Sequence, residues 1–190
     1  MAIKIYVDQG HGASVNAGAE GFGLYEQDIT YMVGAYLADI LDEDYRFEAK
    51  TSRNSIYDNV GTNQSSSLRI RTTEANNWPA DYFISIHCNA STNPSQNGTE
   101  GYVFSYGSEA YYLAGNIVNE IVRRTNTNNN GVLTNPSLYV LRNTTMPAVL
   151  VELAYITNFN DAVKLLYDQY QFSYGIYVGL LNYLGLPQIL

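Results

Sequence analysis

The sequence predicts an α/β fold: a single domain with a mostly parallel, twisted sheet of about six strands and helices on both faces. Short apolar runs alternate along the chain with longer segments whose apolar residues recur at helical spacing, which is typical of such sheets. The 190 residues are 46% hydrophobic and 15% charged, which suits one domain with a sizeable core. No apolar run approaches the ~18 residues of a membrane-spanning helix, so we expect no membrane insertion.

The first elements along the chain alternate in type. Residues 2–8 read as a strand that ends at Asp8. A helix follows within residues 21–41, where apolar residues recur three, four and seven positions apart and form one face. Residues 45–51 then read as a second strand.

The next helix and strand carry clear boundary signals. Residues 65–78 are expected to be helical, with Ser65 or Ser66 as the N-cap and Pro79 beyond the end. Residues 81–87 are apolar on both faces, which is typical of a buried central strand.

The second half of the chain continues the alternation, although the asparagine-rich run at 125–131 reads as a polar loop. The expected elements are a strand at 100–106, a helix at 108–124, strands around 138–141 and 147–152, and a closing helix at 166–184. The domain is therefore expected over residues 1–184. Residues 185–190 read as a chain end or as the start of a linker.

Charge and cysteine content exclude several classes of protein. The formal net charge is −8 and the isoelectric point is about 4.6, whereas nucleic-acid binding needs a basic face. The single cysteine, Cys88, excludes an internal disulfide framework and a cysteine-rich metal site. The N-terminus has no signal-peptide pattern, so we expect synthesis in the cytoplasm without a signal peptide.

Chemically capable side chains stand where three predicted strands end. The first strand leads to His11, the third ends at His87, and the last ends at Glu152. A fourth residue, Glu26, opens the first long helix. Ligands of open α/β sheets gather outside the carboxyl ends of the strands, so these four side chains are candidates for one site.

Two histidines and one carboxylate match a known metal-binding pattern. Three protein ligands and an open water position are typical of catalytic zinc, and a second carboxylate can act as general base. His11, Glu26 and His87 are therefore the candidate ligands, and Glu152 is the candidate base. Taken singly, each histidine could be a hydrogen-bonded structural residue, and Glu26 could simply complement the helix dipole. Glu152 is harder to dismiss, because an unpaired carboxylate in an apolar run is costly.

Several ordered motifs carry a family resemblance. "VDQGHG" opens the chain, and the Thr-x-Arg pair at Thr51 and Arg53 follows. The expected second helix carries an "R…AN" motif that starts at Arg71. The strand after it ends in "SIHCN", whose last residue is Asn89. The block "LYVLRNTTMPAVLVELAYITN" contains Glu152. Over about residues 3–184 the chain resembles the zinc-dependent N-acetylmuramoyl-L-alanine amidases of the type 3 family.

The chain departs from the family pattern at three positions. Gln9 replaces the usual proline of the first turn, Ala154 replaces the usual glycine after "VEL", and Asn130 replaces an arginine. None of these is a candidate ligand or the candidate base, so they concern loop shape and substrate fit.

The resemblance implies a phosphorylase/hydrolase-like fold and a catalytic domain over residues 1–184. It implies one Zn²⁺ per chain, held by His11, Glu26 and His87, that activates water and polarises the scissile carbonyl. Glu152 would accept the proton and pass it to the leaving amine. The bond cut would be the amide between N-acetylmuramic acid and L-alanine of the peptidoglycan stem peptide. Asp8 and Asn89 are candidates for orienting the ligands.

Alternatives remain at this point. The chain could be another zinc peptidase, or an inactive wall-binding module. Without a signal peptide we expect a phage or prophage endolysin that acts at the bacterial cell wall after release. The alternative is a cellular autolysin or spore amidase. Because Gram-positive walls are polyanionic and the chain is acidic, we expect wall binding to need groove contacts or a separate wall-binding module after Pro187.

Overall fold

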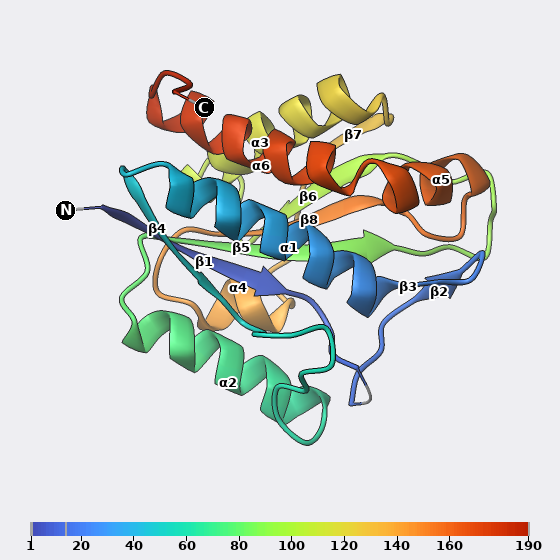
Figure 1. Ribbon diagram of the computed structural model, residues 1–190, viewed down its shortest axis with the longest axis horizontal. Coiled ribbons are helices and arrows are strands. Elements are labelled where there is room, and N and C mark those ends of the chain that lie inside the picture. The colour runs from blue at the N-terminus through green and yellow to red at the C-terminus, as the bar shows by residue number, and fades with distance from the viewer. Residues whose placement is uncertain (1, 14, 190) are drawn as a thin grey trace.

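A computed structural model describes residues 2–13 and 15–189, and its fold is the predicted α/β architecture (Figure 1). Six strands form one sheet in the spatial order β4-β1-β5-β8-β6-β7. Their bounds are β1 Ile3–Gln9, β4 Phe47–Thr51, β5 Tyr82–Asn89, β6 Thr99–Val103, β7 Asn129–Thr134 and β8 Ala148–Tyr155. The neighbours β4, β1, β5 and β8 run parallel, β6 runs antiparallel to β8, and β7 is parallel to β6.

Helices cover both faces of the sheet (Figure 1). One face carries α1 (Glu26–Glu43), α3 (Glu109–Thr125) and α6 (Gln169–Leu184), and the other carries α2 (Gln64–Asn77) and α4 (Tyr139–Asn143). A short hairpin, β2 (Glu20–Gly21) and β3 (Leu24–Tyr25), leads into α1, and α5 (Phe159–Tyr167) follows β8. The expected fold class is confirmed.

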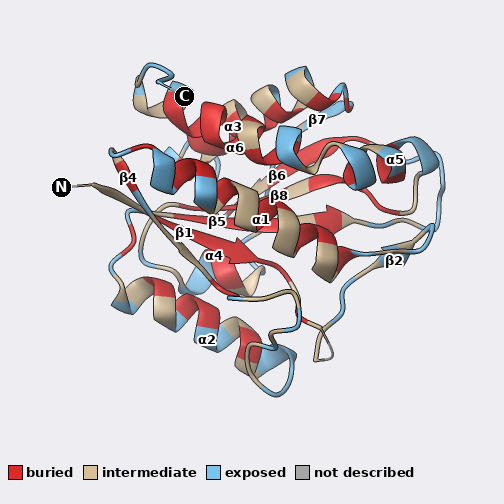
Figure 2. Cartoon of the chain, in the orientation of Figure 1, coloured by how far each residue is buried: buried red, intermediate tan, exposed pale blue. Residues whose placement is uncertain are grey.

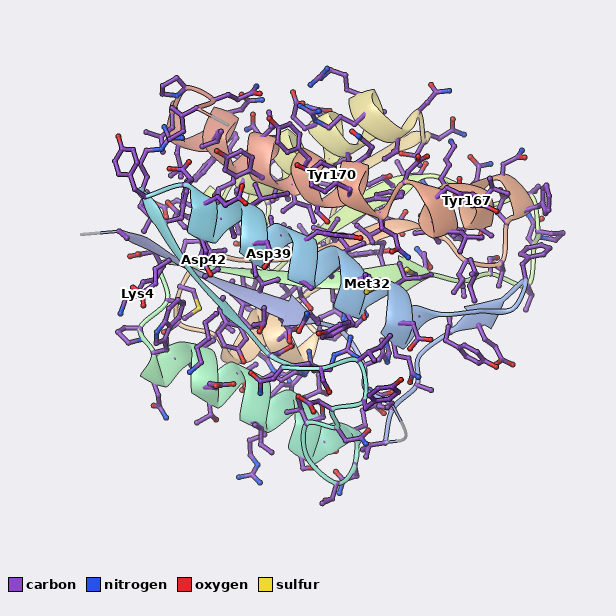
Figure 3. The ribbon with its side chains drawn as sticks, viewed as in Figure 1. Lys4, Met32, Asp39, Asp42, Tyr167 and Tyr170 are labelled. Atoms are coloured by element: carbon purple, nitrogen blue, oxygen red, sulfur yellow. The ribbon has the colours of Figure 1, made fainter. Side chains whose placement is uncertain are left out.

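The core lies between the sheet and these helices. Figure 2 shows the central strands buried along most of their length, while the helices carry both buried and exposed residues. The outward side of α1 carries Asp39 and Asp42, which are exposed (Figure 3). Its inward side buries apolar residues such as Val33 and Leu37, as the helical spacing predicts. Among the described residues, no helix combines the length and apolar character needed to cross a membrane.

Two sequence expectations in the second half are wrong. Residues 138–141 were expected as a strand, but they lie at the start of α4, where Val140 and Leu141 are buried in the core cluster on the α2 side. The short apolar run has no period that separates a strand from a buried helical turn. Part of the expected polar loop at 125–131 belongs to β7, an edge strand whose residues are exposed or half-buried. An edge strand of this kind lacks the alternation of apolar and polar residues that identifies a strand with one face in the core.

Two helix boundaries also differ from expectation. The closing helix expected at 166–184 is α6, which begins at Gln169, and a separate helix that was not expected, α5, ends just before it at Tyr167. The N-cap of α2 is Asn63, whose side chain accepts a hydrogen bond from the Ser66 N–H. The Ser66 hydroxyl accepts one from the Asn63 N–H in return, so Ser66 is the third helical residue of a capping box.

Candidate metal centre

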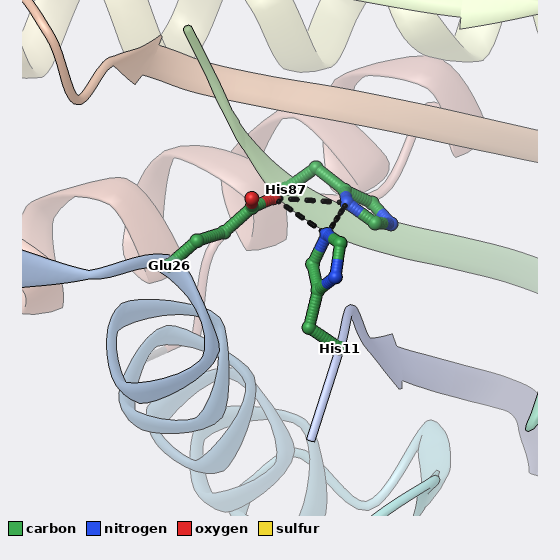
Figure 4. Close-up of side chains that lie close together, drawn as sticks. All are labelled: His11, Glu26 and His87. Carbon is green, nitrogen blue, oxygen red and sulfur yellow. Dashed lines mark hydrogen bonds and ion pairs between the residues drawn. The ribbon is translucent and has the colours of Figure 1, made fainter. Parts of the chain in front are cut away.

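Three side chains far apart in the sequence meet at the carboxyl edge of the sheet (Figure 4). Glu26 Oε1 lies 3.1 Å from His11 Nε2 and 3.0 Å from His87 Nδ1. The two histidine nitrogens are 3.1 Å apart. The group therefore presents two imidazole nitrogens and one carboxylate oxygen to a single point, and it could hold a metal ion.

His11 lies two residues after the end of β1 and is held by the loop that follows. Its φ of 67° lies in the left-handed region, which is uncommon for a residue other than glycine. Its Nδ1 lies 3.1 Å from the carbonyl oxygen of Asn16. A carbonyl can only accept, so Nδ1 carries a proton, and Nε2 is the ring nitrogen that faces Glu26 and would serve as a metal ligand in the neutral ring.

His87 lies on β5, next to β1 in the sheet, and its ring packs against the backbone of Gly10. A Cβ at position 10 would lie 2.5 Å from Cε1 of His87, so only glycine allows this close approach. Burial lowers the pKa of His87 and the charge of Glu26 only partly opposes it. A neutral imidazole is the form that binds metal.

Glu26 is the first residue of α1 and its side chain is buried. Oε1 accepts a hydrogen bond from the Cys88 N–H at 2.9 Å, and Oε2 accepts one from the Ala19 N–H at 2.7 Å. Burial would raise the pKa of Glu26, but hydrogen bonds from His11 and His87 outweigh it and hold that pKa well below its usual range. The reverse holds for His11, where burial acts to lower the pKa but Glu26 raises it.

The geometry of this group fits a zinc ion. In a tetrahedral zinc site with bonds of about 2.0–2.1 Å, neighbouring donor atoms are roughly 3.3 Å apart. The three donors here are 3.0–3.1 Å apart, so a small opening of the triangle would admit the ion. The side chains of His11 and His87 are 16% and 15% exposed, which leaves the group open to solvent on one side.

Glu152 stands beside this group on β8. It pairs with His87 in the register of β5 and β8, and its Oε2 is buried without a hydrogen-bond partner among the described residues. Burial raises the pKa of Glu152 well above the ordinary value, and the charges of Glu26 and Glu100 raise it further. A buried, unpartnered carboxylate beside a candidate metal site is suited to proton transfer.

Sequence reasoning missed Glu100, which lies opposite Glu152 across β6 and β8. Its Oε1 accepts hydrogen bonds from Asn89 Nδ2 at 2.5 Å and from the Tyr102 hydroxyl at 2.9 Å. Glu100 and Tyr102 are two residues apart in a predicted strand and so share one face, a signal that was present in the sequence.

The two residues proposed to orient the ligands have their own partners. Asp8 forms a buried ion pair with Arg71 and accepts a hydrogen bond from the Ser85 hydroxyl at 2.7 Å. Asn89 donates to Glu100. Any effect of these residues on the ligands would be indirect, and their orienting role stays a prediction.

Three such donors at the carboxyl edge of a parallel sheet are typical of a metal-dependent hydrolase. The chain belongs to the N-acetylmuramoyl-L-alanine amidase family of type 3, a family of hydrolases whose model matches residues 5–182. The family resemblance of the sequence motifs is thereby confirmed.

Relatives and solved structures support the same assignment. The amidase CwlM of Bacillus licheniformis is 36% identical over 86% of this chain and 60% of its own length. A sporulation-specific amidase of Bacillus subtilis (strain 168) is 35% identical with the same coverage, and an endolysin of Bacillus phage SPP1 is 31% identical over 90% of this chain and 61% of its own length. An amidase structure from Clostridium difficile 630 has a TM-score of 0.86 at 29% identity and covers 97% of both chains. The chain thus spans about 60% of the length of these curated relatives.

Proposed function

We propose that this chain hydrolyses the amide between N-acetylmuramic acid and L-alanine of the peptidoglycan stem peptide, with one zinc ion per chain. The convergence of His11, Glu26 and His87 beside the unpartnered Glu152 carries this proposal. A zinc ion held by the three donors would lower the pKa of a water molecule and polarise the scissile carbonyl.

The side chains of this chain supply the proton transfers. Glu152 takes the proton from the attacking water, because its buried Oε2 has no competing donor among the described residues. It then gives the proton to the amine of L-alanine as the C–N bond breaks, so the carboxylate returns to its starting state. Glu26 stays ionised throughout, because two backbone N–H groups and both histidines stabilise its charge.

Two other functions fit less well. A peptidase with two metal ions needs additional ligands, and both histidines of the chain already belong to one group. A catalytically inactive wall-binding module would have no use for a preorganised donor triangle with a high-pKa carboxylate beside it.

We propose that the biological role is wall lysis as an endolysin, with a cellular autolysin or spore amidase as the alternative. The relatives include both a phage endolysin and a sporulation-specific enzyme, so they do not favour one role. The net charge of −8 opposes attraction to polyanionic walls. We therefore propose that wall binding depends on groove contacts or on a separate module.

Zinc content and product analysis test this function together. Purified protein should contain about one equivalent of zinc, and digested walls should gain L-alanine N-termini without new reducing sugar ends. Glu152→Gln should keep the zinc and lose a factor of about 10²–10⁴ in rate. Glu74→Gln, a carboxylate change on α2 away from the site, is the matched control and should keep both. Full activity in Glu152→Gln would contradict the assignment of the base.

A further inference from the structure

We propose that Gln9, together with Arg53, is a positioning residue for the metal site. The two side chains join the strand end that leads to His11 with the helix that begins at Glu26. The inference rests on the metal-binding role proposed above for those two ligands, and it assigns a purpose to the replacement of the family's usual proline by Gln9.

Gln9 is fully buried at the end of β1 and connects three segments. Its backbone N–H donates to the Ser52 hydroxyl at 2.9 Å. Its side-chain Oε1 accepts from the Arg53 N–H at 3.0 Å, and its Nε2 donates to the Tyr31 carbonyl at 3.1 Å. One side chain thus ties β1 both to the corner after β4 and to the first turns of α1. Proline could make none of these three hydrogen bonds.

A glycine on α1 makes room for Gln9. A Cβ at Gly34 would overlap with Cγ of Gln9, so a side chain there would push the helix and the strand end apart. Gly34 lies one turn beyond Thr30, on the same side of α1. The close approach of α1 to β1 therefore depends on the pairing of Gln9 with Gly34.

Arg53 forms a second link between the corner after β4 and the first turns of α1, through Gln27 and Thr30. Its buried guanidinium donates through Nη2 to the Gln27 carbonyl at 2.7 Å and to the Thr30 hydroxyl at 3.0 Å. The Thr30 hydroxyl in turn donates to the Gly10 carbonyl at 2.6 Å. Gln27 follows Glu26 in sequence and Gly10 precedes His11, so this chain of hydrogen bonds fixes the backbone next to each of the two ligands.

The arrangement is held at a cost in stability. Arg53 is buried with Nε and Nη1 unpartnered among the described residues. Burial lowers the pKa of Arg53 to about 10, so the guanidinium is still charged at neutral pH. A buried cation with unsatisfied N–H donors lowers the stability of the fold. We take this as an indication that Arg53 serves to fix the geometry of the backbone here.

The first test removes the two side-chain hydrogen bonds of Gln9 and keeps the length of the side chain. Gln9→Met should raise the zinc dissociation constant about 10–100-fold, the usual effect of losing a partner that orients metal ligands. Competition with a chromophoric chelator measures this constant without reference to activity. The d–d spectrum of the cobalt(II)-substituted protein should also change, because it reports the geometry of the ligands.

A matched control separates positioning from general destabilisation. Tyr177→Phe removes a buried hydrogen bond to Asp44, which lies at the other end of α1 from the metal site. It should lower the stability while the zinc dissociation constant and the cobalt spectrum stay as in wild type.

A single and a double substitution at Gly34 and Gln9 distinguish a positioning role of Gln9 from simple filling of space. Gly34→Ala should lower both stability and zinc affinity, because the new Cβ displaces the Gln9 side chain. Gln9→Ala/Gly34→Ala removes the overlapping atoms, so stability should recover in part, short of the two side-chain hydrogen bonds of Gln9, while zinc affinity stays low. Recovery of both would mean that Gln9 only fills space.

The outcomes distinguish this inference from the function on which it rests. Wild-type zinc affinity in Gln9→Met, or an equal loss in Tyr177→Phe, would overturn the inference. If the wild-type protein bound no zinc, or if Glu26→Gln bound it equally well, the proposed function itself would fail.

Discussion

Glu100 and Glu152 lie directly opposite each other on the antiparallel strands β6 and β8. Opposite residues on one sheet face have Cβ atoms about 4.5–5.5 Å apart, so two carboxylates here repel each other. The charge of Glu100 contributes, after burial and Glu26, to the raised pKa of Glu152. The pair thus adds to the effect of burial and of Glu26, and the proposed base holds its proton more strongly.

Neutralising Glu100 should therefore shift the pH dependence of the reaction. In Glu100→Gln the pKa of Glu152 falls, and because the base must be ionised to accept a proton, the acid limb of kcat/KM should move to lower pH. A pH profile on soluble muropeptides measures the shift. Glu74→Gln changes a carboxylate elsewhere and should leave the limb in place, and a shift to higher pH in Glu100→Gln would contradict the pairing.

Replacing the proposed base should stabilise the metal-free protein. The pKa of Glu152 is raised in the folded state above its unfolded value of about 4.3, so the folded state loses stability as the pH rises past that value, where the carboxyl ionises in the unfolded chain first. Glu152→Gln should raise the free energy of unfolding at neutral pH by about 1–3 kcal/mol, with the gain disappearing below about pH 4. Urea denaturation with a chelator present measures this. A less stable Gln variant at neutral pH would show that the carboxylate has favourable partners.

The backbone of His11 should favour glycine over alanine. At a φ of 67° a Cβ is unfavourable, so His11→Gly should be more stable than His11→Ala by about 1 kcal/mol, although both lose the proposed ligand. Thermal denaturation of the two variants gives the difference. The same comparison at Asn126, with a φ of 53° at the end of α3, should have the same sign. Equal stabilities at both positions would contradict the backbone argument.

The buried pair of Asp8 and Arg71 should be sensitive to the loss of one partner. Asp8→Asn leaves the Arg71 guanidinium buried without its carboxylate, which should destabilise the protein by about 3–5 kcal/mol. Asp8→Leu/Arg71→Met removes both charges and should recover most of that loss. The zinc dissociation constant of the double variant also tests whether Asp8 orients the ligands, since an unchanged constant would speak against it.

Much of the site could be predicted because adjacent parallel strands end at the same edge of the sheet. That rule links His11, His87 and Glu152 from the sequence alone, and Glu26 joins them because it opens the next helix. Glu100 escaped the rule, since β6 is antiparallel and brings its first residues, not its last, to this edge.

The errors in the fold have an equally local cause. β7 lies at the edge of the sheet, so its polar residues need no alternating apolar pattern. α4 has only 5 residues, which is too short for a helical period to be recognised in the sequence. Hydrogen bonds such as those of Gln9 depend on contacts between segments that are distant in the sequence, which no local pattern contains.

The order of strands in the sheet divides the chemistry between the two halves of the chain. The three proposed metal ligands lie within the first 87 residues, and Glu152 lies on β8, beyond the exposed stretch 92–96. A cut in that stretch would yield one fragment with all three proposed zinc ligands and another with the proposed general base, Glu152. Pairing of β5 with β8 brings them together, so a nicked protein should regain activity only when the two fragments reassociate.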